Sequence, residues 1–290
     1  MSTSCIRRLA GLLVVLVLGM LLAMPAQAAP SALTQSITAH HNENRCVDHK
    51  QIETWSNQQA IEARGFNFDI VGPQASVMFQ HDLALDLATT DNSAYTASRM
   101  TEIDSELPIA QRVKCWLATP DKDVVIEFRV RFNESATPAG LTENLVLWNA
   151  PLPSFNGTNP PSESAVPLTS IGVARTSALG TPLYIATVVQ DLDLTTYNGL
   201  LSFAVIPSWL DPGDWHQVKL TLSQQSARIE VAQGQHEYEQ VLEQQLLHPA
   251  EPLGFEFSVD NEAFPGYYVP VTEPDRIEID YLSMRMVRSH

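Results

Sequence analysis

Residues 124–132 alternate between apolar and charged side chains, and this pattern limits the possible folds more than any other feature of the chain. Successive side chains of a β-strand point to opposite faces, so this segment is predicted to be a strand with one buried face and one wet face. The apolar positions are Val124, Ile126, Phe128, Val130 and Phe132, and the charged positions are Glu127, Arg129 and Arg131.

The same period recurs in three later segments, which we also predict to be strands. Their apolar faces are His216, Val218, Leu220 and Leu222; then Phe255, Phe257 and Val259; then Ile277, Ile279 and Tyr281. Shorter strand candidates, separated by turn residues such as Asn198-Gly199 and Gln233-Gly234, are 94–100, 112–118, 144–148, 170–175, 183–189, 200–206 and 228–231. Many short strands at even spacing favour an all-β, antiparallel two-sheet sandwich or barrel.

Helical signals are few. Residues 50–64 end at Gly65 and form one helix candidate, although their apolar spacing is irregular. Residues 236–247 contain good helix formers but fit a strand and its return equally well. We therefore expect only minor helical segments.

The N-terminus has the pattern of a secretory signal. Arg7 and Arg8 precede an apolar run over 9–24, and small residues follow at Ala26 and Ala28. The run is shorter than the ~20 residues that span a bilayer. We expect cleavage after Ala28, a secreted or extracytoplasmic protein, and no membrane insertion afterwards.

The chain is strongly acidic. Its formal charge is −16, and loss of residues 1–28, which contain two arginines and no acid, makes it −18. Such a surface repels phosphate backbones and anionic headgroups, which argues against nucleic-acid or membrane partners.

Two cysteines, Cys46 and Cys115, follow the signal. An even pair in an oxidising compartment predicts a disulfide, which would stabilise the fold by about 4 kcal/mol in the loop-entropy model. It would tie an N-terminal segment, residues 29–76, to a sandwich domain over 77–290.

The last third of the chain resembles the concanavalin A-like lectin/glucanase superfamily, particularly its laminin-G-like members. The resemblance rests on Gly213-Asp-Trp-His-Gln-Val-Lys-Leu-Thr-Leu222, on Pro252-Leu-Gly-Phe-Glu-Phe257 and on the closing Ile277-Glu-Ile-Asp-Tyr-Leu282. It implies a jelly-roll fold and a glycan or extracellular glycoprotein as partner. Because fold does not decide activity, a glycoside hydrolase or lyase and a structural or adhesive protein-binding domain remain alternatives.

Catalytic carboxylates are only weakly indicated. The family's glucanases carry Glu-x-Asp-x-x-Glu on one strand, and Glu278-Ile-Asp280 begins this pattern, but Ser283 stands at its last position. The pattern also lies near the end of the chain, whereas the family's motif lies in the middle. Glu127 on the wet face of its strand is a further weak candidate. The sequence therefore favours a carbohydrate-binding or surface-binding module without catalysis.

Ligand candidates are aromatic residues, because sugar faces stack on rings. They are Trp148, Trp209, Tyr267 and Tyr268, although the strand position of Trp148 favours a place in the core. Calcium, which binds clustered oxygen ligands, is an optional cofactor by analogy with the family. Its candidate ligands are the acidic pairs Asp191 and Asp193, Asp211 and Asp214, and Asp260 and Glu262, which fit ordinary acidic turns equally well.

Overall fold

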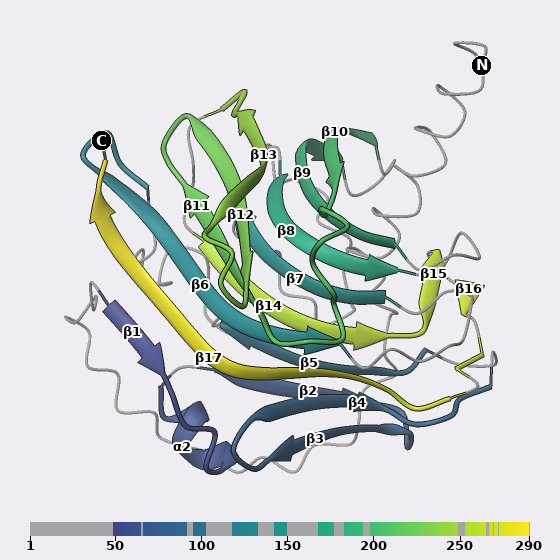
Figure 1. Ribbon diagram of the computed structural model, residues 1–290. Coiled ribbons are helices and arrows are strands. Elements are labelled where there is room, and N and C mark those ends of the chain that lie inside the picture. The colour runs from purple at the N-terminus through teal and green to yellow at the C-terminus, as the bar shows by residue number, and fades with distance from the viewer. Residues whose placement is uncertain are drawn as a thin grey trace, which may run out of the picture.

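The computed structural model describes residues 49–64, 66–91, 95–102, 118–132, 142–149, 168–176, 183–193, 198–248, 253–264, 267–268, 270–271 and 273–289. In these ranges two large antiparallel sheets form a sandwich, so the predicted all-β jelly-roll class is confirmed (Figure 1). The signal with its cleavage site at Ala28, and both Cys46 and Cys115, lie outside the described residues. Cleavage and the disulfide stay predictions.

Sheet A has the strand order β13-β12-β11-β6-β17-β4-β3, and β1 also pairs with β17. Strand β17 contacts β4 through its first half and β1 through its second half, on the same side. The strands are β1 (His49–Ile52), β3 (Ala75–Phe79), β4 (Leu83–Leu87), β6 (Lys122–Phe132), β11 (His216–Leu222), β12 (Ser226–Gln233), β13 (Glu239–Gln245) and β17 (Asp275–Arg288).

Sheet B has the order β10-β9-β8-β7-β14-β5-β2 and lies behind sheet A in Figure 1. Its strands are β2 (Asn67–Val71), β5 (Ala97–Glu102), β7 (Thr142–Asn149), β8 (Leu168–Thr176), β9 (Leu183–Asp193), β10 (Asn198–Val205) and β14 (Leu253–Asp260). A small ribbon of β15 (Glu262–Phe264) and β16 (Tyr267–Tyr268) follows β14. Because β1 and β2 belong to the two sheets, the described residues before 77 are built into the sandwich.

The core lies between the sheets. Phe128 of β6 packs against Phe255 and Phe257 of β14, with ring centroids 6.3 and 5.3 Å apart. The predicted inward faces of β6, β11 and β14 belong to this buried cluster, except that His216 of β11 is a buried polar residue beside it. Alternation therefore identified the core correctly in these three strands.

Strand β17 departs from the predicted pattern. A β-bulge lies between Ile279 and Tyr281, so Leu282 and Met284 continue the buried face that Ile277 and Ile279 begin. Tyr281 consequently faces outward, and the prediction that it shares a face with Ile277 and Ile279 is wrong.

The helix predictions are only partly correct. Residues 50–64 contain the end of β1 and one short helix, α2 (Gln58–Glu62), whose first turn is capped by Asn57. Residues 236–247 contain β13, so the strand alternative holds there. In the described ranges, no helix has the length and apolarity needed to cross a membrane.

Candidate functional site

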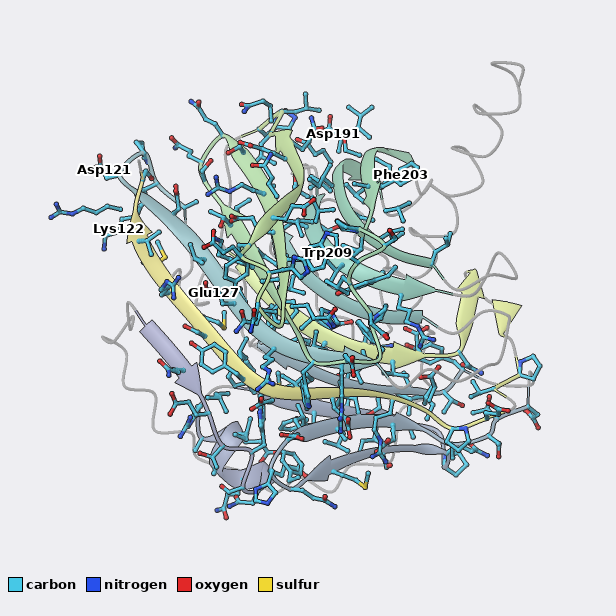
Figure 2. The ribbon with its side chains drawn as sticks, viewed as in Figure 1. Asp121, Lys122, Glu127, Asp191, Phe203 and Trp209 are labelled. Atoms are coloured by element: carbon cyan, nitrogen blue, oxygen red, sulfur yellow. The ribbon has the colours of Figure 1, made fainter. Side chains whose placement is uncertain are left out.

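A groove of about 560 Å³ hollows the outer face of sheet A. Its floor comes from β6, β11 and β17, while Glu53 after β1 and Tyr238 before β13 extend it to either side. We call it the sheet A groove, and it is lined by Glu53, Glu127, Phe128, Arg129, Gln217, Tyr238, Asp280 and Tyr281. Figure 2 shows Glu127 on β6. Glu127, Arg129 and Gln217 lie here because they are outward positions of β6 and β11, whose alternate residues fill the core.

The bulge in β17 brings Asp280 and Tyr281 together in the groove. Trp55, which has no exposed surface, donates a hydrogen bond from Nε1 to the Asp280 carbonyl over 3.0 Å. A bulge leaves a backbone group without its ladder partner, and Trp55 satisfies this one. The segment after β1 therefore fixes the backbone at the groove floor.

Two groove carboxylates have arginine partners. Arg129 lies 2.6 Å from Asp280 Oδ2, and Arg285 lies 2.5 Å from Glu127 Oε2. Both pairs join β6 to β17 across the sheet. In each of these carboxylates, at least one oxygen is therefore paired with a guanidinium.

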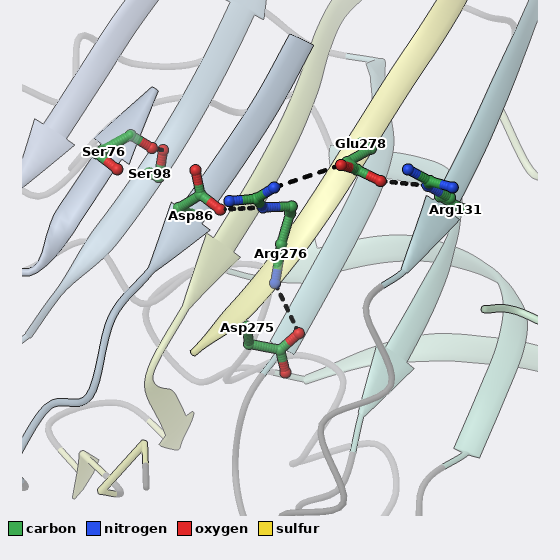
Figure 3. Close-up of polar contacts among 7 residues, drawn as sticks. All are labelled: Ser76, Asp86, Ser98, Arg131, Asp275, Arg276 and Glu278. Carbon is green, nitrogen blue, oxygen red and sulfur yellow. Dashed lines mark hydrogen bonds and ion pairs between the residues drawn. The ribbon is translucent and has the colours of Figure 1, made fainter. Parts of the chain in front are cut away.

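A chain of charged side chains continues beside the groove (Figure 3). Arg276 pairs with Asp86 of β4 and lies 3.4 Å from Glu278, which in turn pairs with Arg131 of β6. Burial raises the pKa of Asp86, although the Arg276 hydrogen bond and charge oppose this change. Desolvation alone would lower the pKa of Arg276, but Asp86 and Glu278 together raise it. The network keeps Glu278 engaged with two arginines.

Aromatic rings lie next to these charges. Lys219 Nζ is 4.5 Å from the Tyr238 ring centroid, and the guanidinium carbons of Arg129 and Arg131 are 5.3 and 4.8 Å from that of Trp215. Burial, reinforced by Glu127 and Glu230, raises the pKa of Tyr238. Its hydroxyl therefore keeps its proton and is a hydrogen-bond donor at neutral pH.

The predicted ligand residues lie elsewhere. Trp209 stacks on His236 with centroids 4.6 Å apart and donates to Glu239 over 3.1 Å, so one ring face is occupied. Trp148 is on β7, and Tyr267 and Tyr268 are on β16; their side chains lie outside the described set.

The predicted calcium ligands are also separated. Among the described side chains, no three Asp, Glu, His or Cys residues gather as a metal site would require. Asp191 Oδ1 lies 3.1 Å from His248 Nε2, and Asp211 accepts the Gly213 amide over 2.9 Å. Asp214 lies in that same turn, Asp260 is buried at the end of β14, and Asp193 and Glu262 are placed only by their backbones, in β9 and β15. Calcium binding therefore stays a prediction, since the described side chains form no metal cluster and those of Asp193 and Glu262 are not among them.

A second group of polar residues lies on the outer face of sheet B. Glu256, Ser258 and Arg99 are buried there, on the neighbouring strands β14 and β5. Burial raises the pKa of Glu256, and the charge of Asp69 adds to this, while Arg99 and the Ser258 hydroxyl oppose it. Glu256 is therefore a buried carboxyl with a raised pKa on the outer face of sheet B.

Sequence reasoning placed Glu127 and Asp280 among the candidates but missed Glu53, Gln217 and Tyr238. Gln217 was recognisable as an outward residue of its strand. Glu53 and Tyr238 lie beyond strand ends, where alternation carries no information, so only the fold brings them to the groove.

No family model and no curated protein sequence matches the chain. Its fold is similar to that of a glycoside hydrolase family 16 endo-glucanase from Bacteroides ovatus, with TM-score 0.51, 8% identity and coverage of 81% of this chain and 99% of that one. The kappa-carrageenase from Pseudoalteromonas carrageenovora gives TM-score 0.50, 10% identity and coverage of 89% and 100%. Peanut lectin gives TM-score 0.47, 12% identity and coverage of 83% and 98%. The chain therefore has the antiparallel jelly-roll fold that the endo-glucanase and the carrageenase share.

Proposed function

We propose that this protein is a secreted carbohydrate-binding module without catalytic activity, and that its glycan lies in the sheet A groove. The observation that carries the proposal is the groove itself, in which two tyrosines stand among hydrogen-bonding side chains on a rigid sheet. Sugar rings present apolar faces edged by hydroxyl groups. Tyr238 and Tyr281 offer ring surface, and Gln217, Glu53 and Asp280 offer donors and acceptors.

The ion pairs in the groove support binding over hydrolysis. A glycosidase needs one carboxylic acid that gives a proton to the leaving group and a second carboxylate as base or nucleophile. Glu127, Glu278 and Asp280 each accept contacts from arginine through their carboxylate oxygens. This arrangement orients the three carboxylates as hydrogen-bond acceptors for a ligand.

A glycan array, run with calcium and again with EDTA, tests the proposal together with a polysaccharide hydrolysis screen. We expect binding in both buffers and no turnover. Tyr238→Ala and Tyr281→Ala should each weaken binding by about fivefold, which corresponds to about 1 kcal/mol of lost ring contact.

Trp209→Phe is the matched control, because it changes an aromatic residue that lies outside the groove lining. Binding should be unchanged in this variant, and thermal unfolding should show that all three variants are folded. Loss of binding in Trp209→Phe alone would indicate that the glycan binds at the loop before β11 and not in the sheet A groove. A silent array would favour the structural or adhesive alternative.

Glu256 favours a second candidate function, a glycoside hydrolase acting on the outer face of sheet B. Burial raises the pKa of Glu256, which is the direction that a general acid needs, and Asp69 supplies a nearby exposed carboxylate. If the screen finds turnover, Glu256→Gln should abolish it, whereas Glu127→Gln should leave it in place. Turnover that survives Glu256→Gln would exclude this assignment.

A further inference from the structure

Glu53 differs from the other carboxylates that line the sheet A groove, Glu127 and Asp280, because it has no guanidinium partner. The residue is exposed, and its Oε1 accepts a hydrogen bond from Gln51 Nε2. In the described part of the chain no basic side chain pairs with it. The groove therefore holds a carboxylate whose charge is available to a ligand.

Glu53 and Tyr281 lie side by side. The ladder of β1 and β17 is antiparallel and pairs Ile52 with Leu282, which places the residue after β1 opposite the residue before Leu282. Because Ile52 and Leu282 are buried, alternation turns both of these neighbours outward, where they line the groove. A carboxylate and an aromatic ring are both groups that bind an ammonium ion.

An ammonium already occupies this kind of setting on the other side of the groove. Lys219 Nζ lies 2.8 Å from Glu230 Oε2 and 4.5 Å from the ring centroid of Tyr238. Attraction of the cation to the tyrosine ring adds to the ion pair. Glu53 and Tyr281 offer the same combination to a ligand.

The guanidinium groups at the groove already have acidic partners. Arg129 pairs with Asp280, and Arg285 pairs with Glu127. A carboxylate or sulfate group on a glycan would compete with these acids, and it would approach a chain whose formal charge is −16. The groove therefore disfavours an acidic glycan and attracts a cationic one.

We infer that the glycan of the sheet A groove carries free amino groups, as polymers of glucosamine do, and that Glu53 binds the ammonium. Glu53 has this role only if the glycan lies in the groove, so the assignment rests on the proposed function. An N-acetylated sugar lacks the positive charge, and a uronic acid carries the opposite one. The order of affinity is therefore amino sugar, then neutral sugar, then uronic acid.

Isothermal titration calorimetry in mildly acidic buffer of low ionic strength tests this order. The probes are equal-length oligomers of chitosan, chitin and cellulose, which share one linkage and differ in an amine, an acetamide or a hydroxyl group, and an oligoglucuronate of the same linkage. We expect the chitosan oligomer to bind about fivefold more tightly than the chitin and cellulose oligomers, which is the size of an exposed ion pair. The oligoglucuronate should bind most weakly, and added salt should reduce the advantage of chitosan.

Glu53→Gln removes the charge but keeps the size of the side chain. Affinity for the chitosan oligomer should fall about fivefold, while affinity for the cellulose oligomer stays unchanged. Glu62→Gln is the matched control, because Glu62 is also exposed and accepts a hydrogen bond from a glutamine, Gln58, but lies on α2 outside the groove lining. This control should keep all wild-type affinities.

The possible failures separate the assignment from the proposed function. Equal affinities for chitosan and cellulose oligomers, or a preference for the amine that survives Glu53→Gln, would overturn the assignment. If none of these oligomers binds, but Tyr238→Ala weakens binding of other glycans on the array, the amino-sugar class is wrong and the proposed function stands. Absence of binding both to the oligomers and on the array would remove the two together.

Discussion

At the scale of single residues, the protonation of His216 is coupled to the stability of the fold. It is 1% exposed, and the Tyr184 hydroxyl lies 2.8 Å from its Nε2. Its Nδ1 lies 3.0 Å from the Asp214 carbonyl, which only accepts, so the proton is on Nδ1 and Nε2 accepts from Tyr184. The neutral ring satisfies both partners, and a second proton would break the contact with the Tyr184 donor.

This arrangement predicts a loss of stability in acid. Burial lowers the pKa of His216 to about 4, against 6.5 for the free side chain, while the Asp214 carbonyl and the Asp211 charge only partly oppose it. The unfolded chain therefore takes up a proton first, and the free energy of unfolding should fall by about 3 kcal/mol as pH drops from about 6.5 to about 4. Urea unfolding across this range measures the slope.

His216→Gln keeps a donor and an acceptor but does not titrate, so its slope should be smaller over the same range. The exposed His236→Gln should keep the wild-type slope. Equal slopes in all three proteins would show that other groups cause the acid sensitivity.

At the scale of elements, alternation predicted β6, β11 and β14 because each buries one face uniformly against the other sheet. It failed in β17 because a bulge depends on partners that are distant in sequence. Trp55 and Asp280 are separated by 225 positions, and no local pattern records their contact. The sequence could therefore identify the outward acids but not the tyrosine that the bulge turns toward them.

The bulge itself can be tested through Trp55. Trp55→Phe keeps most of the buried ring but removes the donor to the Asp280 carbonyl. We expect the free energy of unfolding to fall by about 1–3 kcal/mol, since a buried acceptor loses its partner. If the proposed function holds, glycan affinity should fall as well, because Asp280 and Tyr281 lose their fixed backbone.

Denaturant unfolding and the glycan array measure these two effects. Trp209→Phe, which removes a partly exposed indole donor to Glu239, is the control for the change of ring. An unchanged stability in Trp55→Phe would mean that water replaces the indole.

At the scale of the whole molecule, the two sheets are joined by charge as well as by the core. Arg175 of β8 lies 4.0 Å from Asp275 at the start of β17, and both are almost fully buried. Removing one member leaves the other charge without this compensation. We expect Arg175→Met to lower the free energy of unfolding by about 3–5 kcal/mol, measured by denaturant titration.

The double variant Arg175→Met with Asp275→Asn should recover part of this loss, because the buried charge that has lost its Arg175 contact is then removed as well. Additive effects of the two substitutions would show that the pair does not act as a unit.

The position of β17 has a consequence for the order in which sheet A can form during synthesis. This last strand lies in the middle of sheet A, between β6 and β4, and supplies Asp280 and Tyr281. In a nascent chain that has not reached residue 275, the edges of β6 and β4 that later pair with β17 are therefore unpaired. Such an intermediate can pair with strands of other chains, so folding of this protein should depend on shielding the nascent chain until β17 has been synthesised.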